Sequence, residues 1–418
     1  MSSAGVGAAL EQFDPAWPEL AVDPYPVYDD YRAREPVHWG LAANPRLPGS
    51  WYLFGYDDCV AALADPRLKS DPASVGLGDA YPPAFQPVAH VFGAWLGALD
   101  APDHTRIRSV MAKAFTPRRI RATQPRIRQL ADDLLTDALR SGEPFDLVAD
   151  YAFPLPMAVI GDLLGVPEAD REQFRSLGEA FAEALSNPGS AAAAEAGGNA
   201  TRTMLEYFEA LLAARRRAPG DDLISAMLAA ANDEGQVMTE LEVLAEAIEM
   251  IVAGHETTVN TVAKASHGLL CTDRWAAVAE TEPDLSASGS GSALEELLRW
   301  VSPAQRERNR WVTEPMSIGD RSLAVGEAVV VMIGAANHDP ARFPDPHSLV
   351  LDRPASRHLT FGHGPHTCLG AQLARMEVGT AMDVLFTGAP GLRLAGDVRW
   401  RNNTMIPGPE ELIVTVRP

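Results

Sequence analysis

One loop near the C-terminus constrains this 418-residue chain more than any other feature. It reads Phe361-Gly-His-Gly-Pro-His-Thr-Cys368-Leu-Gly370, so one of only three cysteines lies among glycines, and a helical pattern follows from Ala371. Glycines let the backbone fold closely around a side chain, and the amide groups and dipole at the start of a helix stabilise a thiolate. A lone cysteine without partner ligands at finger-like spacing does not make a zinc site. The loop therefore predicts one thiolate that binds a metal from one side.

A single axial thiolate is the ligand that one class of haem iron uses. The loop fits the pattern Phe-x-x-Gly-x-x-x-Cys-x-Gly at every fixed position, and it resembles the cysteine loop of the cytochrome P-450 family, the haem-thiolate monooxygenases. The resemblance extends from Pro24-Tyr-Pro-Val-Tyr28 to the C-terminus, in the style of the soluble bacterial branch. Taken alone, the loop also fits a structural cysteine buried beside a glycine turn.

The resemblance implies a mainly α fold with small β-sheets, formed as a single domain over residues 1–418. It implies that haem b, iron protoporphyrin IX, lies between a long central helix and the cysteine loop. Cys368 would be the axial iron ligand, and Phe361, Gly362 and Gly370 would lie beside the cofactor.

The long helix is predicted to begin after Thr239, which forms a capping box with Glu242, and to end near His267. Its middle reads Ala253-Gly-His-Glu-Thr-Thr258. Glycine inside a helix costs roughly 1 kcal/mol relative to alanine, and threonine hydroxyls can bond to carbonyls one turn back. We therefore expect a local bulge at Gly254 that opens a groove for a diatomic ligand. The hexapeptide alone also fits a kinked core helix.

The resemblance assigns roles in oxygen activation to this segment. Thr257 is expected to be the hydroxyl that orders water on the oxygen side, and Glu256 the acid that relays protons to it. Ala253 is expected to lie against the haem, and His255 and Met405 to contact the substrate.

A second pair matches the family's Glu-x-x-Arg. Glu296 and Arg299 are three residues apart, so they meet on one helix face, and the resemblance implies a buried structural pair. From spacing alone a surface ion pair fits equally. Ser348 stands where the family has a third, arginine partner, which leaves His347 and Arg353 as candidates for that place.

Haem carries two propionates, and buried carboxylates need cationic partners. Four positions match the propionate ligands of the family: His104, Arg108, Arg310 and His366. His104 and Arg108 lie one turn apart on an expected helix, and His366 stands two residues before the cysteine. Each of the four, taken alone, also fits a solvated surface group.

Hydrophobic periodicity predicts further elements along the chain. A strand is expected at Trp51-Tyr-Leu-Phe54, followed by a helix that Asp57 or Asp58 caps and that ends at Ala64. Residues 70–98 read as a long loop with some helix, and residues 186–198 as a break between helices. The remaining helices are expected from Gln124 and near 157–164, 168–186, 200–217 and 221–231, and a strand at 328–333.

Composition excludes several classes of partner. The net charge of −21 argues against nucleic acid and against an anionic membrane, and no apolar run reaches transmembrane length. The N-terminus lacks the basic flank and apolar run of a signal peptide. Three scattered cysteines do not make a disulfide framework, so a cytoplasmic protein is expected.

The resemblance implies a monooxygenase that uses O₂ to hydroxylate, epoxidise or oxidatively couple a small organic substrate, in the biosynthesis of a secondary metabolite or antibiotic. No electron-transfer domain is found, so electrons would come from a separate ferredoxin-type donor to a monomeric protein. A non-catalytic haem protein, acting as a gas or ligand sensor or carrier, is the alternative. The Glu256-Thr257 pair speaks against it, because a passive binder needs no proton relay.

Two further expectations concern charge. Basic residues follow the helix that bears Arg108 and predict a docking patch for an acidic ferredoxin, the alternative being a solvated basic face: Lys113, Arg118, Arg119, Arg121, Arg126 and Arg128. Arg306 and Arg308 share the side of Arg310 if this stretch is a strand, which would place Arg306 over the substrate cavity. An arginine there predicts an anionic substrate, unless it reaches water or pairs with another acid.

Pro407-Gly408 replaces the usual Arg-Gly of the branch in a loop that is expected to shape the pocket.

Overall fold

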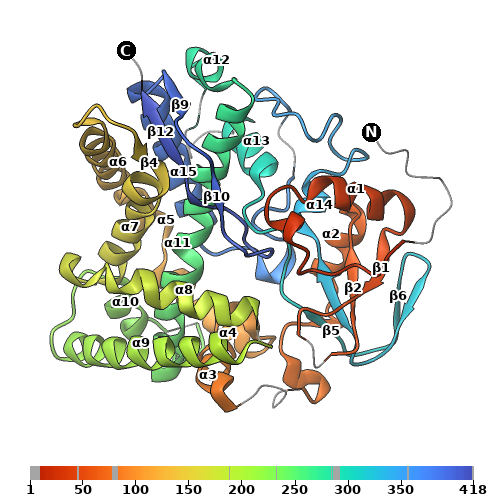
Figure 1. The fold of residues 1–418 in the computed structure, drawn as a ribbon. Coiled ribbons are helices and arrows are strands. Elements are labelled where there is room, and N and C mark those ends of the chain that lie inside the picture. Colours follow the sequence, from red (N-terminus) through yellow and green to blue (C-terminus); the bar gives the residue numbers. More distant parts are fainter. Residues whose placement is uncertain are drawn as a thin grey trace.

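The computed structural model describes residues 10–44, 47–77, 83–187, 189–231, 233–283, 285, 292–354 and 357–416. Over these residues the chain is mainly helical with small sheets, as predicted, and the largest sheet lies to one side of the helices (Figure 1). No described helix combines the length and apolarity that are needed to span a lipid bilayer.

The helices gather mainly on one side of the molecule. They are α3 (Gln86–Phe92), α4 (Asp103–Ala114), α5 (Pro117–Ala122), α6 (Gln124–Leu139), α7 (Pro154–Leu164), α8 (Gln173–Ser186), α9 (Ala191–Arg217), α10 (Leu223–Ala229), α11 (Glu240–Cys271), α12 (Trp275–Glu280), α13 (Ser292–Val301) and α15 (Ala371–Gly388). Beside the largest sheet lie α1 (Tyr25–Arg34), α2 (Tyr56–Ala64) and α14 (Ile333–Asn337).

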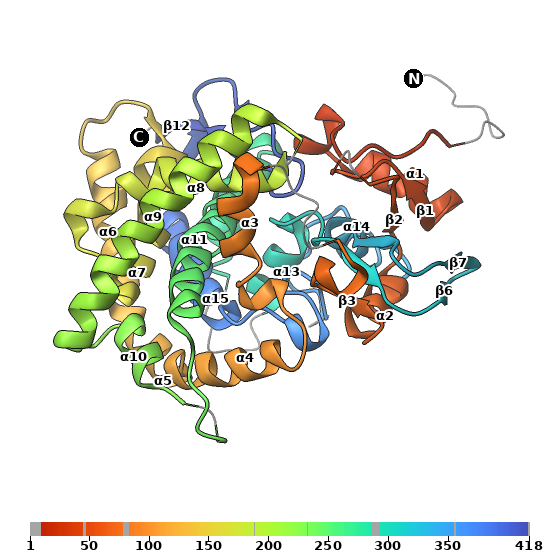
Figure 2. The same ribbon diagram turned by 90° about the horizontal axis from the view of Figure 1, so that it is seen from below.

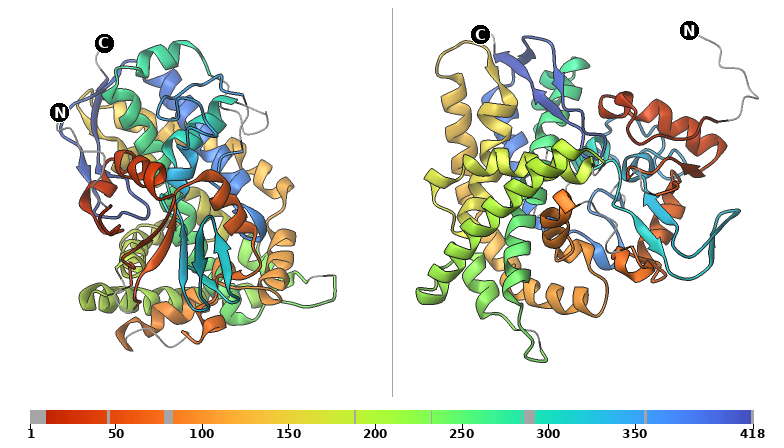
Figure 3. Two further views of the ribbon diagram at one scale, coloured as in Figure 1. Left: turned by 90° about the vertical axis from the view of Figure 1, so that its right-hand side faces the viewer. Right: turned by 60° about the horizontal axis from the view of Figure 1, so that its bottom comes forward.

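The largest sheet joins strands from distant parts of the chain (Figure 3). Its order is β1 (Val37–Gly40), β2 (Ser50–Leu53), β8 (Ala328–Val331), β5 (Arg310–Val312) and β3 (Leu68–Lys69). Only β2 and β8 pair in parallel among these strands, with Tyr52 opposite Val330. The smaller sheets are β4 (Phe145–Asp146), β12 (Ile413–Val416) and β9 (Leu392–Leu394); β10 (Arg399–Trp400) with β11 (Pro409–Glu411); and β6 (Met316–Ile318) with β7 (Arg321–Leu323).

Helix α11 runs through the middle of the helical side (Figure 2). Its capping box is confirmed: the Thr239 backbone N–H donates to Glu242 Oε2 at 2.7 Å, and the Glu242 N–H donates to Thr239 Oγ1 at 3.3 Å. Apolar side chains along most of its length are buried against α7, α9 and α15. The helix ends at Cys271, four residues beyond the predicted end.

The predicted bulge at Gly254 is wrong, because α11 is α-helical without interruption from Glu240 to Cys271. The threonine hydroxyls do bond one turn back, from Thr257 to the Ala253 carbonyl at 3.1 Å and from Thr258 to the Gly254 carbonyl at 3.5 Å. These bonds share the carbonyls with the backbone and leave the helix regular.

Two other boundaries also differ from prediction. Helix α9 begins at Ala191, so the second half of the predicted break at 186–198 is helical. Alanine is the best helix former, and Ser190 caps the end by accepting the Ala193 N–H. Close packing against the neighbouring helix α8 requires glycine at position 197, because a Cβ there would overlap Ala184. Helix α2 begins after Gly55 rather than at an aspartate cap.

Candidate active site

A cavity lies between α11 and the cysteine loop and offers about 250 Å³ to the centre of a water molecule. The lining residues on α11 include Ala253, its neighbour Gly254, and Thr257 one turn later, which share a face. Ala253 and Gly254 are exposed although they lie in the central helix, because their open surface faces this cavity. The other lining residues are Leu96, Gly97, His104, Arg108, Met111, Phe115, Ile160, Glu246, Glu249, Met250, Glu307, Arg308, His366, Thr367, Cys368, Leu369, Gly370, Leu373, Ala374 and Glu377.

The cysteine loop presents its thiol to the same cavity. The Cys368 backbone N–H donates to the Phe361 carbonyl at 2.9 Å, which closes the loop around the sulfur. Gly364 has a φ of +72°, and a Cβ there would lie 2.6 Å from the Leu63 carbonyl oxygen, so the turn requires glycine. The thiol lies deep in the protein and is exposed only toward the cavity. Burial raises the pKa of Cys368, and the Gly370 backbone N–H opposes that rise.

The four residues that were predicted to bind propionates form one cluster at the edge of this cavity. The rings of His104 and His366 lie 4.3 Å apart, and Arg108 Nη2 donates to the Thr367 carbonyl at 2.8 Å. Arg310 Nη1 donates to Ser70 Oγ at 2.6 Å, and Ser70 Oγ lies 3.3 Å from His366 Nε2. Ser70 was missed by the sequence reasoning, because no motif marks it.

The two arginines of this cluster bond to uncharged groups, Arg108 to a carbonyl and Arg310 to a hydroxyl, and neither forms an ion pair with a described residue. His104 Nε2 and His366 Nδ1 are buried and have no hydrogen-bond partner among the described residues. Burial and the neighbouring Arg108 lower the pKa of His104, and burial together with Arg310 lowers the pKa of His366 to about 2. These unpaired ring nitrogens and the two arginines suit a group with two carboxylates. Together with the thiol and the apolar walls, they fit haem.

Glu256 opens to a different space from Thr257, because successive helix residues point about 100° apart. Its Oε1 lies 3.3 Å from Arg401 Nη1 in a second pocket. Burial raises the pKa of Glu256 to about 6, and Arg401 opposes the rise. The acid–alcohol pair is therefore split between the two sides of α11. The second pocket is further lined by Ser176, Glu179, Ala180, Ala182, Glu183, Asn402, Asn403 and Glu410.

Arg306 lies away from the predicted position over the substrate cavity. Residues 302–309 are irregular and β5 begins only at Arg310, so the strand alternation that was assumed does not apply. Arg306 is not among the described residues that line the cavity; it is buried near the hydroxyls of Tyr28 and Tyr52, and its Nε has no partner among the described residues. Arg308 lines the cavity instead.

The two other predicted substrate contacts also lie outside the described lining. His255 is buried, with Nδ1 2.8 Å from the Ile251 carbonyl oxygen and its ring edge against Phe153. The Met405 carbonyl accepts the Gln305 N–H at 2.8 Å. Phe361 and Gly362 shape the cysteine loop without lining the cavity, whereas Gly370 lines it.

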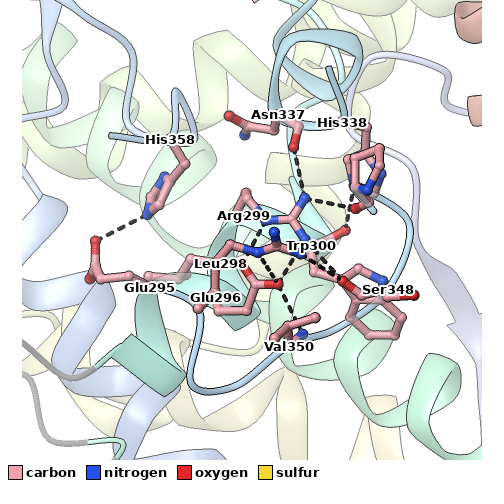
Figure 4. A network of polar contacts seen from close by, with 12 residues as sticks. Glu295, Glu296, Leu298, Arg299, Trp300, Asn337, His338, Ser348, Val350 and His358 are labelled. Atoms are coloured by element: carbon pink, nitrogen blue, oxygen red, sulfur yellow. Dashed lines mark hydrogen bonds and ion pairs between the residues drawn. The ribbon is translucent and has the colours of Figure 1, made fainter. Parts of the chain in front are cut away.

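The Glu-x-x-Arg pair, Glu296 and Arg299, is buried in a network with Asn337 and Ser348 (Figure 4). The third, arginine partner of the pair is Arg353. Arg299 donates from Nε and Nη2 to both oxygens of Glu296, at 2.7 and 2.8 Å. Arg353 Nε donates to Glu296 Oε1 at 3.0 Å, although Ser348 occupies the expected sequence position. Ser348 contributes only its backbone carbonyl, and His347 lies 2.8 Å from Asp29 instead.

Four acidic residues line the cavity: Glu307, just before Arg308, and three that the sequence reasoning missed, Glu246, Glu249 and Glu377. Glu377 on α15 accepts a hydrogen bond from Thr258 Oγ1 at 3.3 Å, and burial raises the pKa of Glu377 to about 8. The helical spacing of Glu249, Ala253 and Thr257 was the available signal for Glu249.

Known proteins share both this sequence and this fold. Residues 291–386 match the family model described as cytochrome P450. Cytochrome P450 107B1 of Saccharopolyspora erythraea is 39% identical over 88% of this chain and 89% of its own length. The chain belongs to the cytochrome P450 family. Nocardicin C N-oxygenase of Nocardia uniformis is 37% identical to this P450 over 95% of the chain and 96% of its own length.

The solved structures agree with that assignment. The cytochrome P450 PksS of the bacillaene polyketide synthase of Bacillus subtilis 168 superposes with a TM-score of 0.87 at 34% identity, over 97% of this P450 and 100% of PksS. This P450 is accordingly a haem-dependent monooxygenase that uses O₂ and electrons from a redox partner. The alternative of a non-catalytic haem sensor or carrier is not supported, since the relatives are monooxygenases and hydroxylases.

Proposed function

We propose that this P450 binds haem b through the Cys368 thiolate and oxidises its substrate on the α11 side of the haem, beside Thr257. The observation that carries the proposal is that this thiol and this hydroxyl, 111 residues apart in sequence, line one cavity. Bound haem supplies the iron at which O₂ is reduced. In this proposal residues 1–418 act as one haem-binding domain.

The cluster at the cavity edge would hold the two propionates. Arg108 and Arg310 supply charge, and the open nitrogens of His104 and His366 supply hydrogen bonds. Ala253 would lie against the face of the macrocycle, because it is exposed to the cavity and has a small side chain. The loop of Phe361, Gly362 and Gly370 would hold the thiolate, and the buried Glu296–Arg299 pair would hold the structure behind it.

Protons would reach the cavity through the pair in α11. Glu256 takes a proton from solvent in the second pocket, and Thr257 presents hydrogen-bonded water on the cavity side. A pKa of about 6 for Glu256 supports this role, because the group can exchange protons near neutral pH. The Thr257 hydroxyl now donates to the Ala253 carbonyl, and a rotation about χ1 would free it for water.

The substrate would be a small organic secondary metabolite, including antibiotics, that is hydroxylated, epoxidised or oxidatively coupled. The names of relatives support this class: they include a 6-deoxyerythronolide B hydroxylase, nocardicin C N-oxygenase and a polyketide biosynthesis P450. The earlier reason to expect an anionic substrate is removed, because Arg306 packs near Tyr28 and Tyr52 and not in the described cavity wall.

Electrons would come from a ferredoxin-type protein that docks on the side of the P450 where the cysteine loop lies. The P450 itself would be a cytoplasmic monomer. Four residues of the expected basic patch are already paired: Lys113 with Asp233, Arg119 with Asp221, Arg126 with Asp162, and Arg128 with Asp383. Arg118 and Arg121 are exposed and have no ion pair among the described residues. They lie on α5, which packs on α15 behind the cysteine loop, so the proposed patch narrows to these two.

The test is Thr257→Ala in a reaction reconstituted with ferredoxin, ferredoxin reductase and NADH. We expect this variant to keep its haem and its substrate affinity but to release a larger share of the electrons as hydrogen peroxide, because water beside the oxygen site is no longer ordered. Thr258→Ala is the matched control, since Thr258 bonds to Glu377 and does not line the cavity. An unchanged ratio of NADH oxidised to product formed in Thr257→Ala would remove Thr257 from this role.

A further inference from the structure

Three arginine side chains are buried among the described residues: Arg299, Arg306 and Arg310. Arginine stays protonated in proteins, and a buried charge costs free energy unless an opposite charge or a full set of hydrogen bonds replaces the lost water. Arg299 has such a set, because it bonds to both oxygens of Glu296 and to three backbone carbonyls. Arg310 has the Ser70 hydroxyl and the carboxylate group that is proposed to bind at the cavity edge.

Arg306 has neither kind of partner. It is 9% exposed, and none of its nitrogens forms a hydrogen bond or an ion pair with a described residue. The groups that act on its charge are the tyrosine hydroxyls of Tyr52 and Tyr28, and no described carboxylate or second cation is among them. The neighbouring Glu307 lines the cavity and acts on Arg310 instead. The described part of the chain therefore leaves one buried positive charge without a counter-charge.

The guanidinium of Arg306 has a second donor beside it that is also open. Its Nε is enclosed and unbonded, whereas its two Nη nitrogens are unbonded but not fully enclosed. The Tyr28 hydroxyl likewise has no hydrogen-bond partner among the described residues, and Arg306 is the charge that acts most strongly on it. The Tyr52 hydroxyl is already used, since it donates to the Leu41 carbonyl at 2.6 Å. Open N–H and O–H groups of Arg306 and Tyr28 are therefore neighbours.

The backbone holds Arg306 in this place, on the far side of its segment from the cavity. The Gln305 N–H donates to the Met405 carbonyl at 2.8 Å, and the Glu307 N–H donates to the Val331 carbonyl at 2.9 Å. Glu307 lines the cavity, but Arg306 is not among the described residues that do. A partner for Arg306 is therefore separate from the substrate and from the group at the cavity edge.

We propose that Arg306 and Tyr28 bind one small monovalent anion such as chloride. A single negative charge matches the single unpaired guanidinium, because no second described cation acts on it. The anion is small, because the side chains of Tyr28, Tyr52 and Gln305 around it are each at most 1% exposed and leave little room. Chloride accepts hydrogen bonds from guanidinium and hydroxyl groups, and it loses its water more readily than sulfate or phosphate does.

An anion at this place would connect three parts of the fold. Tyr28 belongs to α1, Tyr52 belongs to β2, and Arg306 belongs to the segment that continues into the cavity wall at Glu307. These groups meet only in the folded protein, so the unfolded chain has no such site. Binding therefore raises the stability of the folded state in proportion to the logarithm of the anion concentration above the dissociation constant.

The test is thermal unfolding of the holoenzyme in sodium chloride and in sodium gluconate at equal ionic strength. Gluconate is too large for the site, and the two salts screen surface charges equally. We expect a higher midpoint in chloride, by an amount that grows by about 1–2 °C for each tenfold increase in concentration above the dissociation constant. Equal midpoints in the two salts at every concentration would overturn the proposal, and this measurement needs no variant.

Arg306→Met removes the charge and keeps the unbranched stem. We expect this variant to unfold at the same temperature in both salts. In gluconate it should unfold at a higher temperature than wild type, because an uncompensated buried charge has been removed. Arg202→Met, which removes an exposed arginine on α9, is the control and should keep the full difference between the salts. A chloride effect that persists in Arg306→Met would overturn the proposal.

Tyr28→Phe removes one hydroxyl and keeps the ring. It should need about tenfold more chloride than wild type for the same rise in midpoint, since a hydrogen bond to a charged group is lost. Tyr151→Phe is the matched control, because it removes a buried hydroxyl that donates to the Ala381 carbonyl far from α1. Its chloride dependence should equal that of wild type. A wild-type chloride dependence in Tyr28→Phe would overturn the assignment of this hydroxyl to the site.

Discussion

Glu256 and Thr257 are neighbours in α11, yet they open to separate spaces. Thr257 lines the cavity that the Cys368 thiol also lines, and Glu256 lines the pocket that contains Arg401. The helix backbone stands between the two spaces. Such an arrangement lets an acid exchange protons with solvent while the oxygen site stays shielded from bulk water.

The unusual environment of Glu256 predicts a pH-dependent contribution to stability. Burial raises its pKa from 4.5 to about 6, so the folded protein binds this proton more tightly than the unfolded chain. The stabilisation is full below about pH 4.5 and is lost as the pH rises through about 6, which amounts to about 2 kcal/mol. Glu256→Gln stays neutral at every pH. The difference in unfolding free energy between wild type and this variant should therefore change by that amount between pH 4.5 and 7.

Urea unfolding at several pH values measures this difference. Glu209→Gln, an exposed change on α9, is the control and should follow wild type across the range. Arg401→Leu removes the cation that lowers the pKa of Glu256, so its midpoint should move to higher pH. Parallel plots of unfolding free energy against pH for wild type and Glu256→Gln would show that folding does not raise the pKa of the Glu256 carboxyl.

The buried network around Glu296 predicts a large loss of stability. Glu296→Gln would leave Arg299 and Arg353 without their carboxylate, and breaking a buried pair in this way costs about 3–5 kcal/mol. Arg353→Leu should cost less, because Arg299 still neutralises Glu296. The midpoints of urea unfolding should fall in that order. Arg399→Leu, which breaks an exposed pair with Glu410, is the control and should cost at most about 1 kcal/mol.

Reduction of the iron by ferredoxin tests the narrowed docking patch. The double variant Arg118→Glu and Arg121→Glu should slow reduction at low salt by at least about tenfold, and salt should reduce the difference from wild type. Substrate affinity should not change, because α5 lies outside the cavity. Arg202→Glu, on α9, is the control with the same charge change. Equal stopped-flow reduction rates for wild type and the double variant at low salt would dismiss the patch.

Local motifs predicted the site well where backbone geometry fixes the residues. The cysteine loop, the capping box at Thr239 and the Glu296–Arg299 pair each lie within a few residues of sequence, so their spacing determines their contacts. The four residues of the expected propionate site also meet, although they come from three distant segments, because the family resemblance supplied the pairing that spacing alone could not.

The failures share a physical cause. Arg306 was placed by strand alternation, but the segment before Arg310 is irregular, so its side chains follow no period. The choice of Arg353 over His347 depends on the turn at 345–348, where Asp345 has a φ of +50° and accepts the Ser348 N–H at 3.2 Å. Neither conformation is encoded in a short pattern.

The proposed chemistry depends on Cys368 presenting a thiolate to iron. The direct measurement is the absorption spectrum of the reduced protein with carbon monoxide, recorded under gentle conditions. We expect the long-wavelength Soret band of thiolate ligation in wild type, and its replacement by the shorter-wavelength, histidine-type band in Cys368→His. A wild-type protein that binds haem but lacks the long-wavelength band would contradict it.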